Sequence, residues 1–120
     1  MRERNIDFQE KYKSVDSFIK GAYGTPEGVS EYIRQMEVSE LEGSLYKESK
    51  EWNSDYKHLK RSRWIRNQLA HEVSIDSDIC EEDDYTWLSD FHKRLFEGED
   101  SLAVLNRAKQ RHRMISILYY

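Results

Sequence analysis

The sequence predicts an all-α fold, an up-and-down bundle of four to five helices. Apolar residues recur at spacings of three and four in several segments, which is typical of amphipathic helices. No stretch of useful length alternates apolar and polar residues as a half-buried strand does. With 120 residues the chain suits one domain, 1–120. We expect the core at about 3–105 and a basic and apolar tail at 106–120.

Composition indicates a folded protein, because 12% of the residues are aromatic and can supply a core. Cys80 is the single cysteine, so no internal disulfide can form and a reducing compartment fits best. No apolar run is long enough to span a bilayer, and "MRERNIDFQE" lacks the apolar segment of a secretory signal. We therefore expect a cytoplasmic protein with no membrane partner.

The first helix is expected over about residues 3–20. Its apolar side chains follow one another at spacings of four, three and four, and they are Phe8, Tyr12, Val15 and Ile19. This spacing places them on one buried face. "GAYGTPEG" ends the helix, and Thr25 before Pro26 predicts the N-cap of a second helix over about 26–38.

A third helix is expected to begin between Leu41 and Trp52 and to run to about Glu72, before "SIDSD". It has two apolar flanks, which is typical of a central helix that contacts neighbours on more than one side. One flank consists of Trp52, Tyr56, Leu59 and Ala70, and the other of Ile65, Leu69 and Val73.

A fourth helix is expected over about 81–97, because the acidic residues of "SDICEEDD" suit the positive start of a helix. Its apolar stripe is Tyr85, Leu88, Phe91 and Leu95. Gly98 is placed to end it. A fifth helix follows, with Ser101 as its cap. The sequence leaves "MISILYY" open between a helical extension, a short strand and a flexible end.

Charge is segregated along the chain, although the total is only −4. Residues 57–66 hold five basic and no acidic side chains, acids dominate 72–100, and 107–113 is basic again. Local potential governs what approaches a surface. A polyanion could therefore bind despite the acidic total.

The segment "RNQLAH", with Arg66, Asn67 and His71, resembles the Arg-x(4–6)-His signature of HEPN domains. An asparagine directly after the arginine matches the form often seen in HEPN ribonucleases. The order of helices also fits, since the motif helix is followed by an amphipathic helix. The resemblance covers about 3–105 in helix order and 66–71 in specific residues.

The resemblance implies a homodimer in which two motifs face each other across a cleft. The implied activity is metal-independent endoribonuclease cleavage of RNA to 2′,3′-cyclic phosphate and 5′-OH ends, in a toxin or defence factor with a separate antitoxin protein. His71 would move protons, Arg66 would hold the phosphate, and Asn67 would orient either His71 or the substrate.

RNA-binding residues are expected next to the motif. Lys60 and Arg63 would guide the RNA backbone by their charge, and Trp64 could stack on a base if exposed. Arg66 and His71 lie about 140° apart around an ideal helix and about 7.5 Å along it. A second copy of the helix could therefore supply the missing partner.

Other interpretations stay open. A catalytically silent HEPN-like dimer could bind a protein or a nucleotide, and a helical nucleic-acid binder could use 57–66 with 107–113. His71 could simply favour the negative end of a helix, and Trp64 could serve packing. The Arg-x4-His spacing also recurs from Arg107 to His112, so the spacing alone is not specific.

No metal or cofactor is expected. The remaining histidines and Cys80 lack the spacing of zinc ligands, and the chain has no calcium-loop or phosphate-loop glycine pattern. The acids at 81–84 are explained by the start of a helix.

Overall fold

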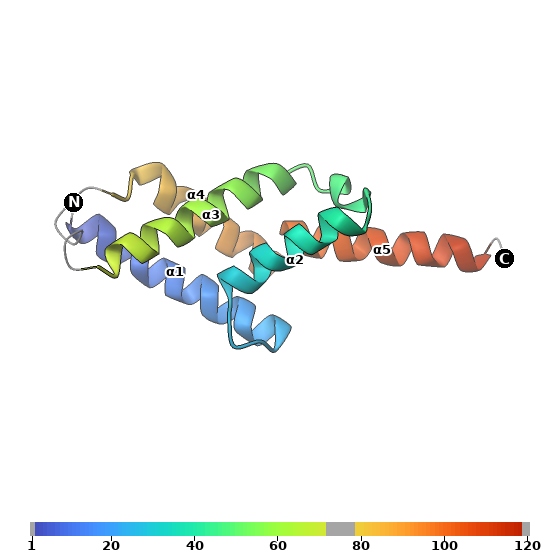
Figure 1. The fold of residues 1–120 in the computed structure, drawn as a ribbon, viewed down its shortest axis with the longest axis horizontal. Coiled ribbons are helices and arrows are strands. Elements are labelled where there is room, and N and C mark those ends of the chain that lie inside the picture. The colour runs from blue at the N-terminus through green and yellow to red at the C-terminus, as the bar shows by residue number, and fades with distance from the viewer. Residues whose placement is uncertain (1, 72–78, 119–120) are drawn as a thin grey trace.

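A computed structural model describes residues 2–71 and 79–118, which form five α-helices and one short 3₁₀ helix (Figure 1). The elements are α1 (Arg2–Tyr23), α2 (Val29–Glu42), η1 (Leu45–Glu48), α3 (Trp52–Leu69), α4 (Glu82–Glu97) and α5 (Ser101–Leu118). The described residues contain no strand, so the all-α prediction is confirmed. The tail is a helical extension as far as Leu118.

The helices form an elongated molecule of 61 × 25 × 25 Å. α3 contacts α1, α2 and α4 and is central, as its two apolar flanks predict. α1 and α2 run toward the end of the molecule from which α5 projects, α3 returns, and α4 and α5 run outward again (Figure 1). The succession therefore does not alternate strictly up and down.

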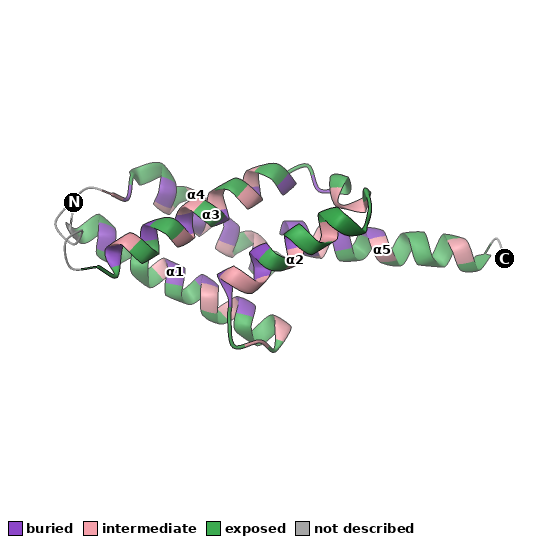
Figure 2. Cartoon of the chain, in the orientation of Figure 1, coloured by how far each residue is buried: buried purple, intermediate pink, exposed green. Residues whose placement is uncertain are grey.

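The core follows the predicted apolar stripes (Figure 2). All four stripe residues of α1 are buried, from Phe8 at 0% to Tyr12 at 6% exposed. In α4 Leu88, Phe91 and Leu95 are buried, and the fourth stripe residue is half-buried. Sequence periodicity thus identifies the buried faces correctly in both helices.

The start of α2 differs from the prediction. The helix begins at Val29 rather than Pro26, and the Thr25 hydroxyl donates to the Glu27 carbonyl at 2.6 Å. The cap comes from α1 instead, because Asp16 Oδ1 accepts the Val29 N–H at 2.8 Å. Gly28 permits this approach, since a Cβ there would overlap Asp16.

The end of α3 also differs from the prediction. The helix ends at Leu69, and its C-cap Ala70 donates its N–H to the Arg66 carbonyl at 3.0 Å. His71 therefore follows the helix rather than lying within it. Ala70 is exposed, although it was expected on an apolar flank. Glu72 and Val73 lie outside the described residues.

Two ion pairs fix α3 against α4. Asp55 is fully buried and accepts two hydrogen bonds from the Arg94 guanidinium, at 2.7 and 3.0 Å, and one from Ser101 Oγ at 2.6 Å. Arg61 donates to both oxygens of Asp84 at 2.6 and 2.9 Å. Buried carboxylates that are paired and hydrogen-bonded hold one geometry. These contacts set which face of α3 is turned toward α1.

Both ends of α4 lie where the sequence predicts them, among the acidic residues near 81 and before Gly98. Glu81 and Asp84 form a capping box at its start, and Gly98 adopts the left-handed conformation at its end with φ of 70°. Within the described residues, no helix combines the length and apolar character needed to cross a membrane.

Candidate functional site

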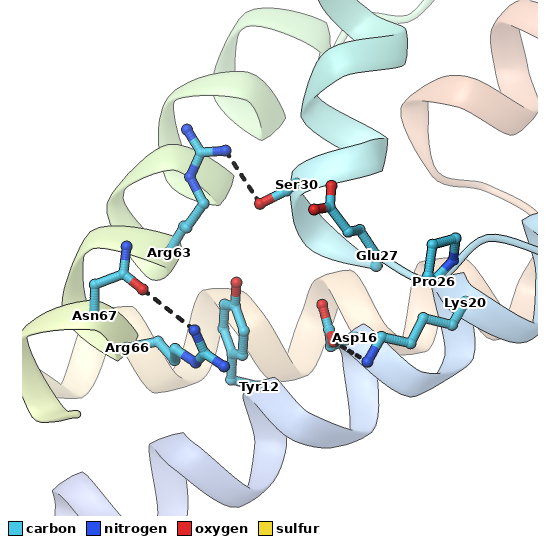
Figure 3. Close-up of a pocket in the computed structure, with 10 residues that line it drawn as sticks. Tyr12, Asp16, Lys20, Pro26, Glu27, Ser30, Arg63, Arg66 and Asn67 are labelled. Atoms are coloured by element: carbon cyan, nitrogen blue, oxygen red, sulfur yellow. Dashed lines mark hydrogen bonds and ion pairs between the residues drawn. The ribbon is translucent and has the colours of Figure 1, made fainter.

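A cleft of about 290 Å³ lies between α1, the start of α2 and the C-terminal half of α3 (Figure 3). Its lining residues come from all three segments and are Tyr12, Asp16, Lys20, Pro26, Glu27, Gly28, Ser30, Arg63, Arg66 and Asn67. A second hollow of about 360 Å³ adjoins it along α1 and shares four of these residues. The cleft therefore continues over the surface of α1 beside Arg66.

Arg63 and Arg66 project from α3 into the cleft, and both are bonded to neutral oxygens (Figure 3). Arg63 Nη1 donates to Ser30 Oγ at 3.3 Å, and Arg66 Nη1 donates to Asn67 Oδ1 at 3.3 Å. Among the described residues neither guanidinium forms an ion pair with a carboxylate. Within the described part of the chain, their charge and several of their N–H donors are thus not taken up by a carboxylate.

Tyr12 forms the floor of the cleft beneath Arg66. The guanidinium of Arg66 lies 5.8 Å from the centre of the Tyr12 ring, a cation–π contact. Burial, and next the carboxylate of Asp16, raise the pKa of Tyr12 to about 12. The phenol therefore stays protonated near neutral pH and can donate a hydrogen bond.

The opposite wall carries Asp16 and Lys20 of α1. Lys20 Nζ lies 3.1 Å from Asp16 Oδ2, while Asp16 Oδ1 caps α2. Both oxygens of this carboxylate are thus engaged. The other acid that lines the cleft, Glu27 before α2, is exposed. Four cationic and two acidic side chains line the cleft and the adjoining hollow together. The net charge of these lining side chains is therefore positive.

The structure brings together some of the predicted site residues and not others. Arg66 and Asn67 line the cleft, as does Arg63. Lys60, Trp64 and His71 are exposed and are not among the lining residues of either hollow.

Lys60 and Trp64 lie four residues apart on one face of α3, with Lys60 Nζ 4.8 Å from the centre of the Tyr56 ring. Trp64 is 50% exposed, so one half of its surface remains open to a ligand.

Sequence reasoning missed the part of the cleft contributed by α1 and α2. Tyr12 was predicted only as a core residue, and its ring is indeed buried. Asp16, Lys20 and Ser30 are ordinary polar residues of helix surfaces, and no local pattern distinguishes them. Only the packing of α1 and α2 beside α3 reveals their position.

The second Arg-x4-His segment serves the fold. Arg107 Nη1 donates to the Gly98 carbonyl at 2.5 Å, and Arg107 Nη2 to Glu99 at 3.2 Å, which closes the turn between α4 and α5. Its basic residues continue onto the end of α5, away from the end of α3 (Figure 1). Among the described residues, no three His, Cys, Asp or Glu side chains gather closely enough to hold a metal ion.

A comparison with known protein families gives a match. The family model DUF6548, described as a family of unknown function, matches residues 6–117. The chain belongs to the DUF6548 family. The matched residues include every residue that lines the cleft, so the cleft lies wholly within the region that defines DUF6548 membership. No curated protein and no solved structure matches the chain.

Proposed function

We propose that this chain is a metal-independent endoribonuclease of the HEPN type that acts as a homodimer. The observation that supports it most is the pair Arg63 and Arg66, whose guanidinium groups donate to neutral oxygens in a polar cleft and, among the described residues, form no ion pair. Arginines held in this way suit the phosphates of RNA, which they can bind through two parallel hydrogen bonds. The "RNQLAH" segment lies at the edge of the same cleft.

The reaction is an internal transphosphorylation. The ribose 2′-OH loses its proton to an imidazole, its oxygen bonds to the adjacent phosphorus, and the bond from phosphorus to the 5′-oxygen breaks. The leaving oxygen takes a proton and becomes a 5′-OH, while the phosphate becomes a 2′,3′-cyclic diester. His71 serves the proton transfers, and Arg66 stabilises the charge that grows on the phosphoryl oxygens.

A second copy completes this site in our proposal. His71 follows the end of α3 and is not among the cleft-lining residues, so one chain supplies the phosphate-binding arginines without the imidazole beside them. Two such ends facing each other would place the His71 of one copy near the Arg66 of the other. This arrangement is the one that the HEPN resemblance implies.

The surfaces around the cleft favour a single-stranded RNA substrate. Lys20 lies on the wall opposite Arg63, so cations flank a backbone on two sides. Lys60 and the half-exposed Trp64 lie on the adjoining face of α3. An exposed indole provides a stacking surface for an unpaired base.

The biological role that accompanies this activity is a toxin or defence factor acting on cytoplasmic RNA. Uncontrolled cleavage of RNA would harm the cell that makes the enzyme. We therefore propose an antitoxin protein that binds the chain and covers the cleft.

The second candidate is a catalytically silent HEPN-like dimer that binds a nucleotide or a protein. The position of His71 outside the cleft favours it, because binding needs the arginines and Tyr12 but no imidazole. The two candidates differ in one respect, namely that only the enzyme changes its ligand covalently.

RNA cleavage in the presence of a chelator tests the proposal. We expect Arg66→Ala to slow cleavage at least about 100-fold, because it removes donors to the developing charge. His71→Ala is expected to slow it about 100- to 10,000-fold through loss of proton transfer. Asn67→Ala should have a smaller effect. The side chains of Arg66 and His71 are both exposed, so their alanine variants should fold normally.

The matched control is Arg107→Ala, which removes the arginine of the second Arg-x4-His segment. Its cleavage rate should equal that of the wild type, while circular dichroism and thermal melts confirm the fold of every variant. Equal rates for the wild type, Arg66→Ala and His71→Ala would refute the assigned site. RNA binding without cleavage by the wild type would favour the silent dimer.

A further inference from the structure

The end of α5 is a helical arm that leaves the bundle. Residues 109–118, here called the arm, follow Ala108, the last buried residue of α5 (Figures 1 and 2). Its apolar side chains are more than half exposed, and they are Met114 (63%), Ile115 (54%), Ile117 (70%) and Leu118 (77%). Contiguous exposed apolar side chains of this size mark an interaction surface.

The charge of the arm restricts its partner. Residues 101–120 carry four of the 19 basic side chains of the protein and none of the 23 acidic ones. The cations lie at 107–113 and the apolar residues at 114–118, so the two kinds are separated along the helix axis rather than around it. A complementary surface must therefore be acidic with an apolar part beside it.

The same chain carries such a surface where α2 meets η1. Residues 37–51, here called the acceptor, hold five acidic and two basic side chains. Leu41 is 89% exposed at the end of α2, and Val38 is 39% exposed one turn before it. Lys109 Nζ lies 3.5 Å from Glu42 Oε1, so the arm leaves the bundle directly beside the acceptor.

A hollow of about 340 Å³ at the base of the arm adds a place for an apolar side chain. It is mostly apolar and is lined by Leu45 of η1 and by Lys109, His112, Arg113 and Ser116 of α5. Leu45 also packs against the core. An aliphatic side chain from another molecule could enter this hollow.

We propose that two copies of this chain exchange arms. The apolar tip of each arm (Met114, Ile117 and Leu118) lies over Leu41 and enters the hollow beside Leu45 of the other copy. Its cations then face the acidic acceptor. A two-fold axis makes the exchange reciprocal, so each association forms the contact twice and leaves no free arm.

Geometry and charge both favour a second copy. The ten residues of the arm extend about 15 Å beyond the last buried turn, and the acceptor lies at the same end of the molecule (Figure 1). Arms that run in opposite directions therefore each reach the other acceptor. Arms aligned in parallel would instead set three cations against three. This interface lies at the end of the bundle opposite the end of α3, so it is separate from the proposed cleft dimer.

Sedimentation of the full chain tests the exchange with one variant on each side of the contact. The arm variant combines Ile117→Asp with Leu118→Asp, and the acceptor variant is Leu41→Asp. We expect each to raise the dissociation constant of the arm contact at least about 100-fold, because both reciprocal contacts are lost together. The molar mass should fall to that of the assembly which the cleft interface alone maintains. The control is Phe96→Asp on α4, where the side chain is also 77% exposed. It should leave the mass unchanged.

Mixing the two variants gives a result specific to exchange. An arm variant retains its acceptor, and an acceptor variant retains its arm, so a mixed pair has one intact contact where neither variant alone has any. The mixture should therefore associate more tightly than either variant by itself, and association should weaken with added salt.

Three results would overturn the proposal. The wild type could sediment with the same mass as the arm variant, or the mixture could associate no better than its components. The arm could instead bind vesicles of phosphatidylserine and phosphatidylcholine in the wild type and not in the arm variant, with no difference in mass. Circular dichroism confirms that the variants fold, which is expected because every substituted side chain is exposed.

Discussion

Arginines of this chain take different roles according to the groups that meet them. Arg61 and Arg94 are bonded to carboxylates and join α3 to α4. Arg63 and Arg66, on the same helix as Arg61, meet a hydroxyl and an amide oxygen instead. Charge held by a carboxylate stabilises the fold, whereas charge beside neutral groups stays available to a ligand. This difference, rather than the number of basic residues, defines the candidate site.

The sequence identifies one half of this site. Arg66 and Asn67 could be selected because they stand next to each other in a motif that resembles a known signature. Tyr12 and Lys20 could not, because their part in the cleft depends on how α1 packs beside α3. Local patterns describe one helix face at a time, and a cleft between helices is a property of several.

Cys80 gives a prediction about stability at alkaline pH. Burial, and next the carboxylate of Asp84, raise the pKa of the Cys80 thiol to about 11. In the unfolded chain the thiol ionises at lower pH, so its contribution to stability is complete below the unfolded pKa and is lost as the pH rises toward 11. At pH 11 we expect the wild type to have lost about 2 kcal/mol more free energy of unfolding than Cys80→Ala.

Urea titrations of both proteins between pH 8 and pH 11 measure this difference. Cys80→Ala leaves a small cavity whose cost does not depend on pH, so only the change in the gap between the two curves matters. Parallel curves over the whole range would contradict the protonated, buried thiol.

The helices can be predicted from the spacing of apolar residues, but not always the residues at which they begin and end. The stripes of α1 and α4 are predicted correctly because each is a local pattern in sequence. The start of α2 is set by Asp16, thirteen residues before Val29 on another helix, and the end of α3 falls at Leu69 rather than Glu72. A cap that comes from a neighbouring helix leaves no local signal, so Thr25 and Pro26 gave the wrong start.

Gly28 provides a prediction at this scale. A side chain at position 28 would overlap both the backbone oxygen and the carboxylate of Asp16. We expect Gly28→Ala to cost about 1–3 kcal/mol of the free energy of unfolding, because the start of α2 must move away from α1. Since Glu27 and Ser30 would move with it, RNA cleavage should also decrease.

Gly21→Ala is the matched control. Gly21 lies within α1, and a Cβ there meets no atom within 4 Å. Alanine favours helix over glycine by about 1 kcal/mol, so this variant should equal or exceed the wild type in stability. Equal stability of Gly28→Ala and Gly21→Ala, measured by chemical unfolding, would contradict the close approach of α2 to Asp16.

The whole molecule has two functional ends in this account. The end of α3 lies toward one end of the bundle, and the arm projects from the other (Figure 1). The total charge of −4 does not reveal the two basic regions, 57–66 and 107–113, because acidic residues elsewhere in the chain outnumber their charges. The sequence predicts the separate charge regions but not their distribution over two ends, since that depends on the directions of α3 and α5.

The chemistry of the RNA ends is the most direct test of the central claim, that Arg66 and His71 catalyse transphosphorylation. A defined RNA is incubated with the wild type in a chelator, and the fragments are analysed by mass spectrometry. We expect 2′,3′-cyclic phosphate and 5′-OH ends, and the same fragments to form at least about 100-fold more slowly with His71→Ala. Fragments that end in 3′-OH and 5′-phosphate, or cleavage that requires a divalent metal, would contradict it.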